Sequence, residues 1–151
     1  MTTVYIVKAE TYDYQDGITN SCVFFSKEKA DKLVEKLACL CTKLSEQKDI
    51  HNKASSEYER DNPFKEPIPY EPRRASGLSK EQVAASKEEW RKGCRALNVK
   101  AEAWFNARKE FADKKMKESG ITLSDEELAL ETKYDISADF FFTVDSLEVQ
   151  D

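Results

Sequence analysis

Residues 83–111 read VAASKEEWRKGCRALNVKAEAWFNARKEF. Large apolar side chains recur in this stretch every seven residues, at Val83, Trp90, Leu97, Trp104 and Phe111. A sevenfold apolar repeat in a highly charged segment predicts a long helix with one apolar seam, which must pack on another element. We expect that element to be a second helix, predicted over residues 27–60, because a proline-rich turn separates the two.

The predicted helices have recognisable start and stop signals. Ser79 and Gln82 fit a capping box at the start of a helix over residues 79–119. Ser119 and Gly120 end that helix. Ser26 is placed to cap the helix over 27–60. A third capping signal, at Ser124 and Glu127, predicts a short helix early in residues 124–151.

Both ends of the chain have the composition of β-strands. Residues 1–26 are rich in β-branched and aromatic residues around an Asp-Gly turn, which predicts a β-hairpin. Residues 140–149 predict a closing strand, with Phe140, Phe142 and Val144 on one face. Leu147 and Val149 have the opposite parity, so we expect a bulge near Asp145 or Ser146 that brings them to the same face.

These elements predict an α+β fold in a single domain, residues 1–151. A three-stranded antiparallel sheet from both termini would carry a long, coiled-coil-like antiparallel helical hairpin inserted between its strands. The connection between the long helices, residues 61–78, contains all four prolines of the chain. Proline favours extended backbone, so we expect an extended connection in which Phe64, Ile68 and Tyr70 serve as anchors.

Charge is unevenly distributed along a chain whose net charge is −5. Residues 79–120 carry 11 basic and 7 acidic side chains, whereas residues 121–151 carry one lysine and 9 acidic side chains. The basic helix permits nucleic-acid binding through Arg91 and Arg95, with Phe105 as a stacking residue. The acidic end would repel the same phosphates, so we expect a solvated helix face and no binding of nucleic acid.

Several chemical functions are disfavoured by what the sequence lacks. It has no phosphate-cradling glycine loop, no nucleophile elbow and no metal-ligand spacing. The four cysteines have no framework spacing, so we expect buried free thiols, and the single histidine, His51, has no nominated catalytic partner. We therefore predict no enzymatic activity, no catalytic residue, no cofactor and no metal.

The expected environment is the cytoplasm. No apolar run reaches the roughly 18 residues that a membrane span needs, and the amino-terminal residues lack the pattern of a secretory signal. Membrane association is therefore not expected.

Exposed aromatic residues in two loops suggest protein recognition instead. Tyr12 and Tyr14 lie in an acidic hairpin loop, and tyrosine on a rigid loop suits a protein interface. A partly packed loop is the alternative interpretation. The expected partner-binding residues come from this loop, the proline-rich connection and the second long helix: Tyr12, Tyr14, Phe64, Ile68, Tyr70, Arg91, Arg95 and Phe105.

Residues 24–33 read FFSKEKADKL. This stretch resembles small phage- and prophage-encoded accessory proteins, in which a β-hairpin runs into a capped helix and a final strand returns to the sheet. The resemblance implies a virus-encoded protein that modulates or inhibits a host defence or regulatory complex, acting in the bacterial cytoplasm on a host or viral protein. It implies no catalytic residues. Self-association through the helical hairpin is a further expectation, because one small sheet cannot cover the whole apolar seam.

Overall fold

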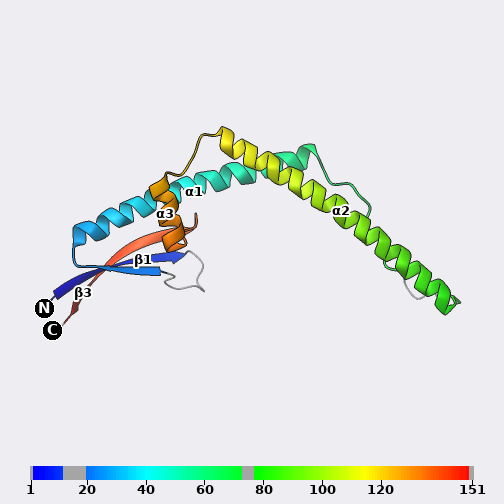
Figure 1. Ribbon diagram of the computed structural model, residues 1–151, viewed down its shortest axis with the longest axis horizontal. Helices are drawn as coiled ribbons and strands as arrows, with labels where there is room; N and C mark the ends of the chain where they lie inside the picture. The colour runs from blue at the N-terminus through cyan, green and yellow to red at the C-terminus, as the bar shows by residue number, and fades with distance from the viewer. Residues whose placement is uncertain (1, 12–19, 73–76, 150–151) are drawn as a thin grey trace. The chain divides into compact units, whose positions relative to one another are not determined.

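The computed structural model describes residues 2–11, 20–72 and 77–149. Within them the chain forms, in order, β1 (Thr2–Thr11), β2 (Asn20–Phe24), α1 (Lys27–Asp61), α2 (Lys80–Glu118), α3 (Asp125–Tyr134) and β3 (Phe140–Val149). The predicted α+β fold is confirmed (Figure 1). The chain divides into two compact units: a sheet unit of residues 1–51 and 116–151, and a helical unit of residues 52–115.

The sheet joins the two ends of the chain. Its strand order is β2-β1-β3, with β1 antiparallel to both neighbours. The closing strand predicted over residues 140–149 joins the sheet, as expected, and it does so by pairing with β1. The amino-terminal strand lies in the middle because both the hairpin partner and the returning strand hydrogen-bond to it. A third strand gives this small sheet the area that a lone hairpin lacks.

The register between β1 and β3 contradicts the predicted bulge. Pairing is continuous from Thr2 opposite Val149 to Thr11 opposite Phe140. Leu147 and Val149 therefore stay on the face opposite to Phe142, and their side chains are 54% and 42% exposed. The prediction was wrong because it assumed that every large apolar residue of the strand must face the core.

A salt bridge helps to keep this parity. Lys8 pairs with Asp145 across β1 and β3, and both residues lie on the same face of the sheet as Leu147. A bulge at Asp145 would turn this carboxylate toward the apolar side, where burying it would be costly. The unbroken register avoids that cost and leaves Leu147 exposed.

The core of the sheet unit lies between one face of the sheet and α1. The side chains of Leu37 and Leu40 are almost completely buried there, together with Ala30 and Cys41. Val7 from the centre of β1 packs against them. α3 lies over the same face and contributes Leu130 and Tyr134, which pack against this core (Figure 1). The sheet unit is thus a two-layer arrangement of helices on a sheet.

The helix starts follow the predicted capping signals. The Ser79 Oγ accepts from the Gln82 backbone N–H at 3.2 Å, and the Gln82 side chain accepts from the Ser79 N–H at 2.8 Å. Ser124 and Glu127 make the same reciprocal pair at the start of α3. Ser26 caps α1 more weakly, with 3.5 Å between its Oγ and the Lys29 nitrogen. These boxes satisfy backbone donors that helix starts leave unpaired.

Candidate partner-binding surface

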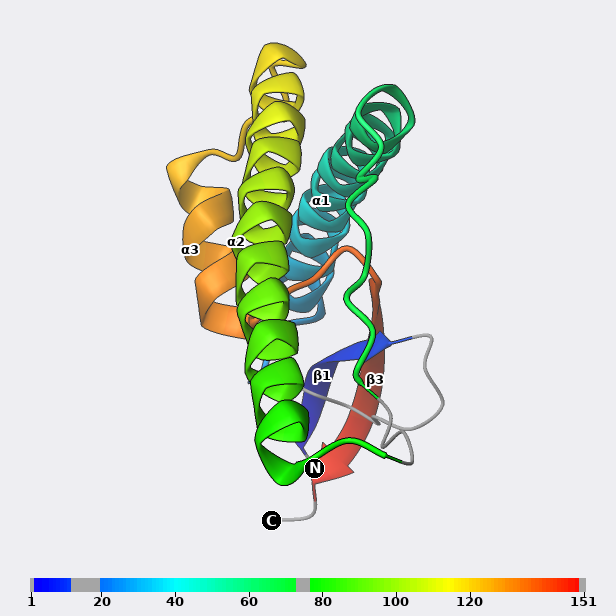
Figure 2. The same cartoon turned by 90° about the vertical axis from the view of Figure 1, so that its right-hand side faces the viewer.

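The helical unit contains an extended segment, residues 62–72, that we call the proline segment. α1 ends just before it because Asn62 precedes Pro63, and a residue before proline is driven out of helical conformation. The indole N–H of Trp104 donates to the Asn62 carbonyl at 2.6 Å. Further along, the indole N–H of Trp90 donates to the Pro69 carbonyl at 3.4 Å. The proline segment therefore runs antiparallel beside α2 (Figure 2).

Two further contacts lie between these indoles. Lys100 Nζ is 2.8 Å from a Glu66 carboxylate oxygen. A side chain added at Gly93 would place its Cβ only 3.3 Å from Cγ of Pro69. Glycine therefore lets the proline ring approach the helix closely, which explains a glycine in the interior of a helix that it otherwise weakens by about 1 kcal/mol.

The spacing of the two tryptophans matches the spacing of the two carbonyls. Trp90 and Trp104 are fourteen residues apart, which corresponds to about 21 Å along a helix. Asn62 and Pro69 are seven residues apart, which corresponds to about 22 Å in a polyproline II chain. An extended chain can therefore follow two heptads of α2 with half as many residues.

The prediction that the helix over residues 27–60 covers the apolar seam of α2 is correct for only part of the seam. Tyr58 of α1 does contact Trp104 and Phe111, with ring centroids 6.0 and 5.6 Å apart. Trp90, however, contacts the proline segment. Because α1 ends at Asp61, the extended chain continues along α2 from that point. The sevenfold period predicted the apolar stripe on α2, but it carries no information on what covers the stripe.

Aromatic side chains gather around Trp104. The Phe64 ring lies 5.9 Å from the Trp104 ring, and the Phe105 ring lies 5.0 Å away in an edge-on geometry. Arg108 lies 6.0 Å over the Trp104 ring and pairs with Glu59 at 2.8 Å. Phe105 nevertheless remains 55% exposed, so the cluster has an open aromatic edge. Phe64 contacts Trp104, as expected of an anchor, and is 38% exposed.

Ile68 and Tyr70 do not act as anchors. The side chain of Ile68 is 77% exposed and that of Tyr70 is 94% exposed. They flank Pro69, whose backbone carbonyl makes the contact with α2. The expectation that they would pack inward was wrong, because main-chain atoms and the proline ring do the packing at this point.

The predicted basic residues are partly paired within the chain. Arg95 lies 3.0 Å and Arg91 3.8 Å from the carboxylate of Glu88. Lys100 and Arg108 pair with Glu66 and Glu59. Exposed pairs such as these contribute little to stability, but they lower the positive field of the helix face. Tyr12 and Tyr14, the remaining predicted partner-binding residues, lie outside the described residues.

The cysteines only partly match the prediction of buried free thiols. All four are free, and Cys41 is buried, with its Sγ 3.4 Å from the Ser137 carbonyl oxygen. Burial raises the pKa of Cys41 to about 11. Cys39 is exposed, so the prediction of a buried thiol was wrong for this residue. Like the neighbouring Ala38, it lies on the side of α1 that faces away from the core. In the described ranges, no three His, Cys, Asp or Glu side chains are grouped so that they could hold a metal ion.

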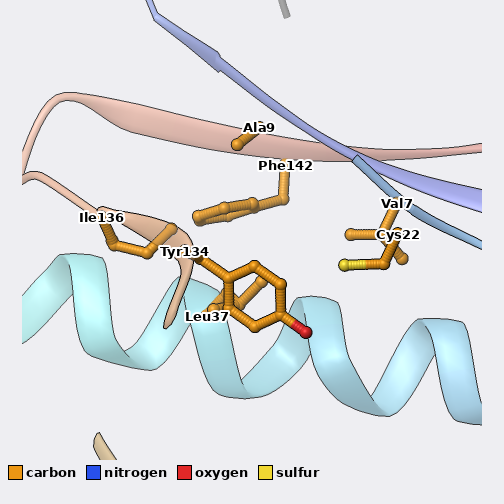
Figure 3. A pocket seen from close by; sticks show the side chains of 7 residues that line it. All are labelled: Val7, Ala9, Cys22, Leu37, Tyr134, Ile136 and Phe142. Atoms are coloured by element: carbon orange, nitrogen blue, oxygen red, sulfur yellow. The ribbon is translucent and has the colours of Figure 1, made fainter. Parts of the chain in front are cut away.

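The interior of the sheet unit contains a small cavity between the sheet and α1. It is lined by apolar side chains together with Cys22 and Tyr134 (Figure 3). Its volume of about 10 Å³ is at the lower limit for one water molecule. Burial and a hydrogen bond with Cys22 raise the pKa of Tyr134. The cavity is too small for a substrate or cofactor and is best explained as a packing defect.

Comparison with family models, curated proteins and solved structures found no match for this chain. Among the described helices, none combines the length and apolar character that crossing a bilayer would require.

Proposed function

We propose that this chain is a non-enzymatic protein-interaction module whose recognition surface lies on the helical unit. One observation carries the proposal. The proline segment is attached to α2 through the backbone carbonyls of Asn62 and Pro69, while Ile68 and Tyr70 are exposed to solvent. The segment is thus held on α2 through two backbone carbonyls and the Phe64 ring, which leaves Ile68 and Tyr70 available to a partner.

Attachment of this kind favours binding for an entropic reason. Ordering a side chain at an interface costs about 0.5–1.5 kcal/mol, and ordering a flexible loop costs more. A segment already held along a helix avoids part of the loop cost. Tyrosine and other aromatic residues are enriched among the residues that dominate interface energies. Tyr70 and the open edge of Phe105 supply such groups.

We further propose that the partner is a protein of a bacterial host, that the chain is a phage-encoded modulator or inhibitor of a defence or regulatory complex, and that it acts in the cytoplasm. The resemblance of residues 24–33 to phage accessory proteins supports this part of the proposal. The recognition surface itself does not depend on it. A partner of viral origin would use the same exposed side chains.

Self-association through the apolar seam remains a separate prediction. Contacts within the chain reduce the need for it, because Trp104 and Phe111 contact Tyr58 and Trp90 contacts Pro69. Light scattering at high micromolar concentration distinguishes a monomer from a dimer formed through this seam.

A nucleic-acid-binding accessory factor is the competing function. It would use Arg91 and Arg95, yet both guanidinium groups already lie near Glu88. We therefore favour a protein partner. A salt-sensitive complex with DNA at physiological ionic strength, lost in the R91E/R95E variant, would reverse this order.

The experiment is a quantitative pull-down from bacterial lysate with the full chain as bait. We expect a stoichiometric protein to be retained by the wild-type chain and lost from I68A/Y70A. The matched control is F25A/L128A, which removes the same number of exposed apolar side chains from the sheet unit. Equal retention by I68A/Y70A and the wild-type chain would contradict the proposed surface. A small metabolite that copurifies in place of a protein would contradict the proposed class.

A further inference from the structure

A second surface, independent of the proline segment, lies in the sheet unit. A groove of about 420 Å³ runs between α1 and α3. Its apolar lining consists of Phe24, Leu33, Leu130 and Tyr134, all half-buried and packed against the core. The groove therefore has a floor that is fixed by the fold.

The edges of this groove are basic. Lys29, Lys32 and Lys36 line it from α1 and Lys133 lines it from α3. All four are exposed. Among the described residues of the lining, Glu126 is acidic, and Glu35 and Glu127 line an adjoining hollow between the same two helices. The described lining therefore carries four ammonium groups and one carboxylate. α3 itself carries four carboxylates between Asp125 and Glu131, so the positive charge of the groove comes from the lysines that line it and favours an anionic group that reaches into the lining.

Two of these lysines already have carboxylate partners. Lys36 pairs with Glu126, and Lys32 lies 2.6 Å from Glu28. Within the described part of the chain, no carboxylate lies within salt-bridge distance of Lys29 or Lys133. The Lys133 ammonium instead lies 5.1 Å from the centre of the Tyr134 ring. Lys29 and Lys133 are therefore the groups that an incoming carboxylate would meet.

The spacing along α1 defines the shape of the partner. Lys29, Leu33 and Lys36 follow one stripe of the helix at positions i, i+4 and i+7. The two lysine positions are about 10.5 Å apart along the axis. A second helix with acidic residues at i and i+7 and leucines at i+3 and i+4 carries the complementary stripe. Its first acidic residue would meet Lys29, and its second would lie near Lys36, which it would share with Glu126. Its leucines would cover Leu33 and Leu130.

We propose that the groove between α1 and α3 binds an acidic amphipathic helix of a partner protein. This is the helix-in-groove mode of recognition, with apolar anchors that are supplemented here by charge complementarity. Leu33 and Leu130 in the floor match the leucines of an amphipathic helix, which a nucleic acid lacks; a single-stranded oligonucleotide that stacks on Phe24 or Tyr134 is the competing outcome of the test. The proposal does not rest on the function proposed for the helical unit.

The test uses a fluorescent, alanine-based peptide of about 16 residues, long enough to be partly helical. It carries glutamates at i and i+7 and leucines at i+3 and i+4. We expect a dissociation constant on the order of 10–100 µM by fluorescence anisotropy, weakening as salt rises from about 50 to 300 mM. A peptide with lysines in place of the glutamates should not bind. The I68A/Y70A variant should bind like the wild-type chain.

Charge reversal locates the site. K29E/K133E should weaken binding at least about tenfold, and the milder K29Q/K133Q should weaken it in the same direction with unchanged circular dichroism. The control K53E/K117E makes the same change in net charge at exposed lysines that do not line the groove. Three results would overturn the proposal: no binding by the wild-type chain, equal weakening by the control, or tighter binding of an oligothymidylate than of the peptide.

Discussion

Trp90 and Trp104 illustrate how a single residue type can serve two roles. Each indole ring contributes to the apolar seam of α2, and each indole N–H donates to a backbone carbonyl of the proline segment. A seam of leucines would have supplied the apolar area without a donor. Tryptophan combines a large apolar body with one polar group, which makes it suitable where a helix packs against exposed backbone carbonyls.

Cys41 provides a prediction about pH at the same scale. Burial raises the pKa of its thiol from 9.0 to about 11. The unfolded chain therefore loses this proton at lower pH than the folded chain does. Below pH 9 the thiol is neutral in both states and costs nothing. Between about pH 9 and 11, ionisation in the unfolded state alone lowers the free energy of unfolding, by up to about 2 kcal/mol.

Urea denaturation at several pH values measures this effect. The free energy of unfolding of the wild-type chain should fall more steeply above pH 9 than that of C41A, whose side chain does not titrate. The absolute stability of C41A will be lower because a buried group has been shortened, so only the slopes are compared. Parallel slopes for the two proteins would contradict the assignment.

At the scale of elements, the two capping boxes invite a direct comparison. Ser79 and Ser124 make the same reciprocal hydrogen bonds at helix starts. α3, however, has only 10 residues and packs on the core, whereas α2 has 39. Loss of the cap in S124A should destabilise the sheet unit by about 1 kcal/mol. S79A should fray the first turn of α2 and leave the sheet unit unchanged.

Hydrogen exchange distinguishes these two outcomes. S124A should increase exchange at backbone amides of β1 and α1 that pack beneath α3, and S79A should increase exchange only near the start of α2. The Glu127 carboxylate also pairs with Lys43 at 2.8 Å, and the hydrogen bond from Lys43 is the main cause of the lowered pKa of Glu127. If S79A and S124A changed exchange in the sheet unit equally, the difference proposed between the two helix starts would be wrong.

The elements also show which features the sequence could predict. Strands, helices and caps depend on neighbouring residues, and Ser79, Ser124 and Gly120 marked the boundaries correctly. The parity of Leu147 was mispredicted because exposure depends on what lies opposite a strand face. The partner of Trp90 was mispredicted because a sevenfold repeat defines a stripe and not its cover. Gly93, placed opposite Pro69, was the available signal for a close approach.

Sites that are assembled from segments far apart in the chain could not be predicted from the sequence. Lys29 and Lys133 line one groove, although about a hundred residues separate them. Nothing in the composition of either segment indicates that they meet. The aromatic cluster was partly predictable, because Phe64 and Phe105 were both expected to bind a partner. Their shared contact with Trp104 could be seen only in the structure.

For the molecule as a whole, we propose that the two units carry separate binding surfaces. The sheet unit has a conventional core of helices on a sheet, and its groove between α1 and α3 is basic. The helical unit has one fully buried apolar side chain in α2, Ala112. Its large exposed apolar side chains lie on the proline segment, on α2 and at Leu78. The central claim is that the contacts of α2 with the proline segment hold Ile68 and Tyr70 ready for a partner.

The most direct test of this claim removes the attachment and leaves the recognition residues intact. W90F/W104F deletes both indole donors to the proline segment while keeping aromatic rings in the seam. The affinity of this variant for the protein retained by the wild-type chain would be measured by isothermal titration calorimetry, after circular dichroism has verified its helices. We predict affinity at least about tenfold weaker than that of the wild-type chain, because the proline segment must then be ordered on binding. Unchanged affinity in W90F/W104F would contradict the account.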